Sequence, residues 1–124
     1  SDASLCPKDP DGVEVDDGNF CIILSKYQGY GRGNTAIAST PSGWKFASLE
    51  VMKQASKHIS AINRILNDMG EPNLYNDWYW TNTYWSSLFV YAINPYTGEV
   101  IKTGSSDTPG TVYEAYHRYY KDCD

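Results

Sequence analysis

The sequence predicts an α+β domain, and two observations support that prediction. Apolar residues keep helical spacing in two consecutive segments, residues 48–58 and 60–69. After Pro72 the composition changes to aromatic, β-branched and turn-forming residues, which favour strands. The expected strands cover residues 78–83, 88–94 and 99–103. The chain should therefore place two helices before a sheet-forming half.

The segments before the helices carry weaker signals. Residues 1–19 are rich in Asp, Pro and Gly, and they predict a polar leader of turns with little to bury and a short strand at 13–15. Residues 20–24 are a short apolar run that predicts a buried strand. Residues 28–43 are glycine-rich without periodicity, so we expect a loop there. This loop lacks the Gly-Lys-Ser/Thr ending of a phosphate-binding loop.

The limits of the helices and of one hairpin follow from local signals. Ser48 is placed to cap the first helix, and Gly70 followed by Pro72 ends the second. Residues 95–98 predict the hairpin turn between the last two strands. The tyrosines of residues 113–120 keep helical spacing, and local propensity alone favours a helix in this tail.

Length and charge limit the domain count and the partners. A chain of 124 residues suits a single domain, 1–124, with the leader at 1–19 and the core of the domain at 20–124. A net charge of -5 argues against nucleic-acid binding, which needs a basic surface. No segment approaches the roughly 18 consecutive apolar residues of a transmembrane helix, so no membrane span is expected.

The three cysteines predict one disulfide and one spare thiol. They lack a C-x-x-C spacing and neighbouring histidines, which makes them a poor zinc site by spacing. Cys6 and Cys123 lie close to the two ends of the chain, so a bond between them would hold both ends to the body. Cys6 with Cys123 is our candidate pair, and Cys21 with Cys123 is an equal alternative. Three buried, reduced thiols in a cytosolic protein are the third possibility.

Residues 73–87 are the expected binding surface. This segment holds three of the four Trp together with Tyr, Asn, Asp, Ser and Thr, a composition that resembles an antibody paratope. The alternative is that its tryptophans are structural. We expect Trp80 to be buried, and we expect partial exposure for Tyr79, Asn82, Tyr84 and Trp85. The candidate ligand-binding residues are Asn76, Asp77, Tyr79, Asn82, Tyr84 and Trp85.

A calcium site is a weaker hypothesis for the segment after the second helix. The string EPN at 71–73 and the string ND at 76–77 match the two halves of the calcium and sugar site of C-type lectins, whose hard oxygen ligands calcium prefers. The ligands would be Glu71, Asn73, Asn76 and Asp77. Only two residues separate the halves, whereas true lectins place a long loop between them. A helix stop followed by a polar loop is the favoured interpretation, and we expect no cofactor.

Three strings resemble a bacterial surface-protein family with a C-type-lectin-like fold. They are GWKFAS at 43–48, WYWTNT at 78–83 and YHRYYKD at 116–122, and their order and spacing cover about residues 20–122. The resemblance implies two helices packed on a small twisted antiparallel sheet with long irregular loops. It also implies that the tail is a strand beside the N-terminal strand, and this implication replaces the helix expected from propensity. Phe46, Ala47, His117, Tyr119 and Tyr120 depart from the family pattern, which indicates a divergent member.

The family resemblance implies a function without catalysis. We expect a secreted or surface-displayed adhesion module that binds a glycan or a protein through its aromatic and polar surface. The alternative is a structural or tip domain packed against a neighbouring subunit or domain of a larger surface assembly. We expect no enzyme, since the acidic residues are scattered over turns and His117 has no second histidine at ligand spacing.

Overall fold

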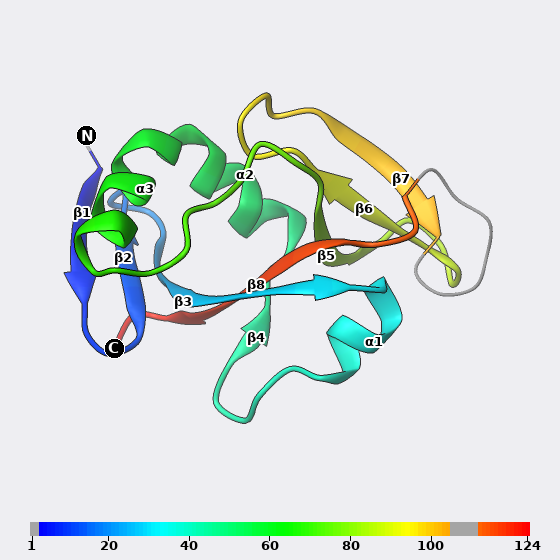
Figure 1. Ribbon diagram of the computed structural model, residues 1–124, viewed down its shortest axis with the longest axis horizontal. Coiled ribbons are helices and arrows are strands. Elements are labelled where there is room, and N and C mark those ends of the chain that lie inside the picture. Colours follow the sequence, from blue (N-terminus) through cyan, green and yellow to red (C-terminus); the bar gives the residue numbers. More distant parts are fainter. Residues whose placement is uncertain (1–2, 105–111) are drawn as a thin grey trace.

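The computed structural model describes residues 3–104 and 112–124, and in that part of the chain it shows eight strands and three short helices (Figure 1). Strands account for 41% and helices for 22% of the described residues. The strands are β1 (Ser4–Lys8), β2 (Gly12–Asp16), β3 (Cys21–Gly31), β4 (Lys45–Phe46), β5 (Tyr79–Tyr84), β6 (Phe89–Ile93), β7 (Val100–Gly104) and β8 (Ala115–Asp122). The helices are α1 (Gly33–Ala38), α2 (Leu49–Lys57) and α3 (Ile59–Asp68).

All eight strands belong to one sheet with the order β1-β2-β3-β8-β5-β6-β7, and β4 pairs with β8 beside that path. The pairs are antiparallel except β5 and β8, which run parallel. The predicted α+β, C-type-lectin-like layout, with two helices on a small antiparallel sheet, is therefore wrong. The described chain is mostly β, because two segments without a strong strand pattern extend the sheet.

The leader is the first of these segments. It forms the antiparallel hairpin of β1 and β2, with a turn at residues 9–11 between them. Val13 and Val15 are 0% and 1% exposed, so the expectation that the leader has little to bury is wrong. The hairpin then pairs with β3 through β2, which moves the edge of the sheet out to β1.

Residues 28–43 are the second segment, and the expected loop is only part of what they form. The strand β3 continues to Gly31, and α1 follows directly from Gly33. No side chain caps the start of α1, so the usual sequence signal of a helix start is absent. The glycines hide the strand pattern because they contribute no side chain to either face of the sheet.

Elements with clear local signals lie where the sequence predicts them. The bounds of α2, α3, β5, β6 and β7 agree with the expected ranges within one residue. The Ser48 side chain accepts a hydrogen bond from the Val51 amide at 3.2 Å and caps α2 as expected. The tail is a strand, β8, which pairs with β3. None of the helices in residues 3–104 and 112–124 has the length and apolarity needed to cross a membrane.

The sheet buries apolar side chains on both of its faces. The helices α2 and α3 cover one face, where the larger core includes Val13, Leu24, Met52 and Leu66 (Figure 1). The helix α1 lies on the other face, over a smaller core (Figure 1). That smaller core contains Ala36, Phe46, Trp80, Val90, Ala115 and Tyr119. Successive residues of β8 therefore alternate between two environments, as strand geometry requires.

The disulfide joins Cys21 to Cys123, so the candidate pair of Cys6 with Cys123 is wrong. The Cys123 amide donates to the Cys21 carbonyl at 3.3 Å, which places the two residues side by side at the end of the β3 and β8 pair. Cys6 lies on β1, three strands away from β8. Strands are about 4.8 Å apart, so the distance between these strands is roughly 14 Å, beyond the reach of a disulfide.

Candidate functional site

The residues predicted to bind a ligand are separated by β5 and do not form one surface. Asn76 and Asp77 are exposed in the loop before β5. Asn82 and Tyr84 are exposed near the far end of this strand, and Trp85 follows it. A strand of six residues spans roughly 17–20 Å, so the two groups lie at opposite ends of β5.

Tyr79 and Trp80 lie between these two groups, and both are buried. Trp80 is 0% exposed, as expected, and its indole nitrogen donates to the Gly31 carbonyl at 2.8 Å. Tyr79 is also 0% exposed, so its predicted partial exposure is wrong. Its hydroxyl accepts from the Tyr75 amide at 2.8 Å and donates to the Gln28 side chain. Burial raises the pKa of Tyr79 above its ordinary value, and the residue is part of the core.

The exposed end of the β5–β6 hairpin carries a small aromatic surface. Trp85 is 53% exposed, and its ring packs against Phe89 with a centroid distance of 6.1 Å. The Lys102 ammonium lies 4.4 Å from the centre of the Trp85 ring. Tyr84 and Leu88 are exposed on the same hairpin.

Each of the four candidate calcium ligands lies in a different environment. Glu71 lies 4.0 Å from the Lys26 ammonium, and Asn76 accepts from the Asn94 side chain at 2.9 Å. Asp77 accepts from the amide of the next residue, Trp78, at 2.7 Å. The Asn73 side-chain oxygen is buried without a hydrogen-bond partner in the described part of the chain. None of these contacts joins two of the four residues to each other.

A bulge in β3 creates a different aromatic site on the face that α1 covers. Leu24 pairs with Tyr120 and Gln28 pairs with Arg118, so residues 25–27 of β3 stand opposite the single residue Tyr119 of β8. An insertion of this kind bends a strand and redirects its side chains. The Tyr27 ring stacks on the Tyr119 ring with a centroid distance of 5.8 Å and an interplanar angle of 10°. Tyr27 remains 58% exposed, so one face of its ring is available to a ligand.

The buried guanidinium of Arg118 holds this bulge from the opposite face of the sheet. It donates to the Ser25 carbonyl at 2.6 Å, to the Gln28 side chain at 3.2 Å and to the Pro72 carbonyl. Arg118 is 0% exposed, and burial lowers its pKa to about 10, which leaves it charged at neutral pH. The polar backbone of the bulge is thereby paired inside the protein, as buried groups require.

Two hollows of about 340 and 350 Å³ flank the Tyr27 ring, and we call them together the Tyr27 groove. Each is within the size range of small-ligand sites. The first is lined by Tyr27, Tyr30, Gly31, Arg32, Thr35, Ala36, Ser39, Pro41, His117 and Tyr119. The second is lined by Pro10, Asp11, Ser25, Lys26, Tyr27, Pro41, Trp44 and Tyr119. Tyr27, Tyr119 and Pro41 belong to both hollows, which makes them neighbours along one surface.

His117 supplies a buried polar group to the first hollow. It is 6% exposed, one ring nitrogen lies 3.1 Å from the Tyr119 hydroxyl, and the other, Nδ1, is buried without a partner among the described residues. Burial lowers the pKa of His117 to about 4, so the imidazole is neutral at pH 7. Its ring packs against Phe46, and Gly29 lies directly across from it on β3.

The groove is equipped for non-covalent binding. Tyr27 and Trp44 offer aromatic surface, and Asp11 and Lys26 add charges at the second hollow. His117 and the Tyr119 hydroxyl, 3.1 Å apart, add neutral hydrogen-bonding groups at the first hollow.

The sequence analysis missed the Tyr27 groove because its residues come from four segments. The one available signal was that His117 and Tyr119 depart from the motif of the family that the sequence resembles. Neither the models of known protein families nor the sequences of curated proteins match the chain.

Proposed function

We propose that this protein is a non-catalytic recognition module that binds a glycan in the Tyr27 groove. The observation that carries the proposal is the Tyr27 ring itself. It is exposed on one side, held on the other by Tyr119, and flanked by two hollows. A ring fixed in this way loses little freedom when a ligand covers it.

The chemistry of the groove suits a sugar ring better than a charged ligand. A pyranose has an apolar face of C–H groups, which packs on an aromatic ring, and a rim of hydroxyls, which need both donors and acceptors. The neutral imidazole of His117 has one donor and one acceptor nitrogen, and the Tyr119 hydroxyl can do both. The net charge of -5 favours a neutral ligand over a polyanion.

The disulfide supports a secreted or surface location for such a module. Disulfides persist in oxidising compartments and are rare in the cytosol. The Cys21–Cys123 bond therefore agrees with the expected extracellular role.

A second candidate function is assembly through the β5–β6 hairpin. Tyr84, Trp85 and Leu88 are 48%, 53% and 51% exposed there. Clustered exposed apolar side chains are typical of protein interfaces. This surface would contact a neighbouring subunit, whereas the Tyr27 groove would bind the glycan.

A glycan array with purified protein, with and without calcium, tests both candidates. We expect binding that Tyr27→Ala weakens by roughly tenfold or more, in line with loss of an aromatic anchor. Tyr27→Phe should keep the binding, because the stacking ring remains. The matched control is Trp85→Ala, an equally exposed aromatic residue outside the groove, which should bind as the native protein does.

Three outcomes would contradict the proposal or part of it. Glycan binding that is lost in Trp85→Ala and kept in Tyr27→Ala would move the site to the hairpin. Binding that requires calcium would favour the loop of Glu71 and Asp77. No glycan binding at all, together with concentration-dependent association that Trp85→Ala abolishes, would favour the assembly role.

A further inference from the structure

The Tyr27 groove runs along the strand β8. His117, Tyr119 and Lys121 are alternate residues of this strand and therefore point to the same face of the sheet. His117 lines the first hollow, Tyr119 lines both hollows, and Lys121 contacts residues that line the second. Four residues of a strand span roughly 13 Å, which is about the length of two linked sugar units. The groove is therefore long enough for a disaccharide.

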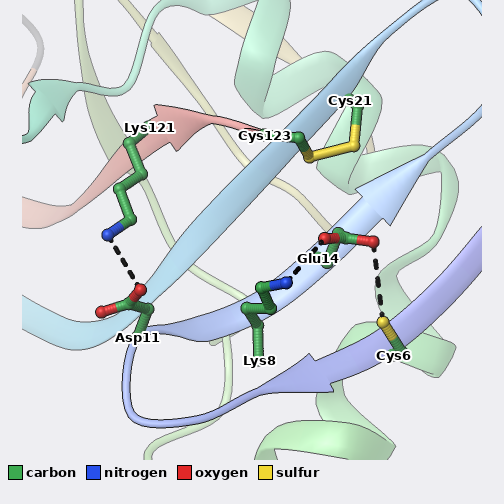
Figure 2. Close-up of polar contacts among 7 residues, drawn as sticks. All are labelled: Cys6, Lys8, Asp11, Glu14, Cys21, Lys121 and Cys123. Carbon is green, nitrogen blue, oxygen red and sulfur yellow. Dashed lines mark hydrogen bonds and ion pairs between the residues drawn. A yellow bond between two sulfur atoms is a disulfide. The ribbon is translucent and has the colours of Figure 1, made fainter.

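Lys121 positions two walls of the second hollow. Its ammonium lies 2.8 Å from the carboxylate of Asp11, in the turn between β1 and β2 (Figure 2). The same ammonium lies 4.7 Å from the centre of the Trp44 ring. The Asp11 carbonyl also accepts from the Lys26 amide at 3.0 Å, which joins the turn to the bulge of β3. These contacts hold the second hollow in shape before a ligand arrives, and such preorganisation lowers the entropic cost of binding.

We propose that the ligand class of the Tyr27 groove is an oligosaccharide of at least two sugar units, with one unit in each hollow and the Tyr27 ring between them. This inference rests on the glycan binding proposed above. Each hollow alone is close to the lower limit of the range for small-ligand sites, about 300–1,000 Å³, whereas the two together lie near its middle. A single sugar unit would leave one of the two hollows, with its aromatic and polar groups, uncovered.

The two hollows offer different groups to the two sugar units. The first contains the imidazole of His117 and the hydroxyl of Tyr119, and both residues are buried. Buried polar groups discriminate strongly between ligands, because a ligand without the matching hydroxyl leaves them unpaired. The second contains Asp11, Lys26 and Trp44, which are all partly exposed and discriminate less. The first hollow therefore selects its sugar unit, and the second adds affinity for the neighbouring unit.

A titration with sugars of increasing length tests the proposal, and NMR chemical shifts report even the weak binding of single units. The probes are homo-oligomers of glucose, galactose, mannose and N-acetylglucosamine, each one to four units long. We expect the two-unit member of one series to bind roughly tenfold or more tighter than its one-unit member. The third and fourth units should add less than about threefold, because they extend beyond both hollows.

Variants separate the contributions of the two hollows. Trp44→Ala should weaken binding of the two-unit sugar by roughly tenfold and leave binding of the one-unit sugar unchanged, a difference that a general loss of structure would not produce. Lys26→Ala, a change at a partly exposed residue of the same hollow, should act in the same direction with a smaller effect. Tyr27→Ala should weaken binding of both sugars. The matched control is Trp85→Ala, which lies outside the groove and should change neither affinity.

Equal affinities of the native protein for one and two sugar units would overturn this proposal and leave the glycan function in place. The proposal also fails if Trp44→Ala and Lys26→Ala both keep the native preference for two units. If Trp44→Ala does not fold, Lys26→Ala alone decides. No binding by any of the series would overturn the proposal as well, and the glycan array then decides whether the glycan function fails with it.

Discussion

The absence of a side chain at Gly29 on β3 leaves room for the ring of His117 on β8. A Cβ atom on residue 29 would lie 2.3 Å from the His117 ring, a distance that real Cβ contacts do not show. Only glycine leaves the imidazole in place at the floor of the Tyr27 groove. The glycine that weakened the strand pattern in the sequence is therefore required by the side chain opposite.

Gly29→Ala should lower the free energy of unfolding by about 1–3 kcal/mol, the usual cost of overpacking. Denaturant unfolding measures it, and a double-mutant cycle with His117→Ala identifies the cause. In the His117→Ala background the added methyl group should cost much less. An equal cost in both backgrounds would show that His117 is not the group that Gly29 accommodates.

His117 should make the stability of the protein depend on pH. Its pKa is about 4 in the folded chain against 6.5 when unfolded, so between these values the unfolded chain binds a proton that the folded chain does not. Stability is highest above about pH 6.5 and falls as the pH drops toward 4, by up to about 3 kcal/mol. Unfolding curves at pH 7 and pH 4 for the native protein and His117→Gln measure the effect. A loss of equal size in both proteins would assign it to carboxylates instead.

The bulge in β3 is the element that creates the Tyr27 groove, and Arg118 is the residue that holds it. Arg118→Met should cost about 2–5 kcal/mol of unfolding free energy, because the Ser25 and Pro72 carbonyls lose a buried charged donor. Lys121→Ala, a change at a partly exposed residue on the same strand, is the control and should cost under about 1 kcal/mol, since its ion pair with Asp11 lies near the surface. Equal and small effects would mean that the bulge is stable without Arg118.

Local signals predicted elements only where a pattern repeats within the element. Ser48, the spacing of Leu49, Met52 and Ala55, and the glycine at position 70 were sufficient to locate α2 and the end of α3. The sequence analysis missed the end of β3, because the residues that pack against it lie on β8 and are not its neighbours along the chain. The exposure of Tyr79 was wrong for the same reason, since its hydrogen-bond partner Gln28 lies 51 residues earlier in the chain.

At the scale of the whole molecule, the disulfide joins residues 102 positions apart in the sequence. Closing a loop of about 100 residues is worth roughly 4–5 kcal/mol in the chain-entropy description. The Cys21→Ser/Cys123→Ser double variant should lose most of that stability in non-reducing denaturation, and Cys6→Ser should lose none. A large effect of Cys6→Ser would mean that Cys6 takes part in the stabilising bond.

The layout of the sheet could not be predicted from local patterns. Single strands at 78–83, 88–94 and 99–103 were correct, yet the partners of each strand depend on residues far along the chain. The resemblance to a family suggested a strand for the tail, which β8 confirms. It also suggested a small sheet with the two terminal strands adjacent, whereas β8 pairs with β3 and lies three strands from β1. The ligand-binding residues predicted in residues 73–87 do not form one surface for the same reason. Composition does not show at which end of a strand each side chain lies.

The central place of β8 has a consequence for how the protein reaches this structure. In the described part of the chain β8 follows the seven other strands, yet it lies between β3 and β5 and joins the two halves of the sheet. The hairpins on either side can form early from local contacts, but their facing edges stay unpaired until β8 inserts. We therefore expect slow, late completion of folding, with two open edges exposed to other chains in the meantime.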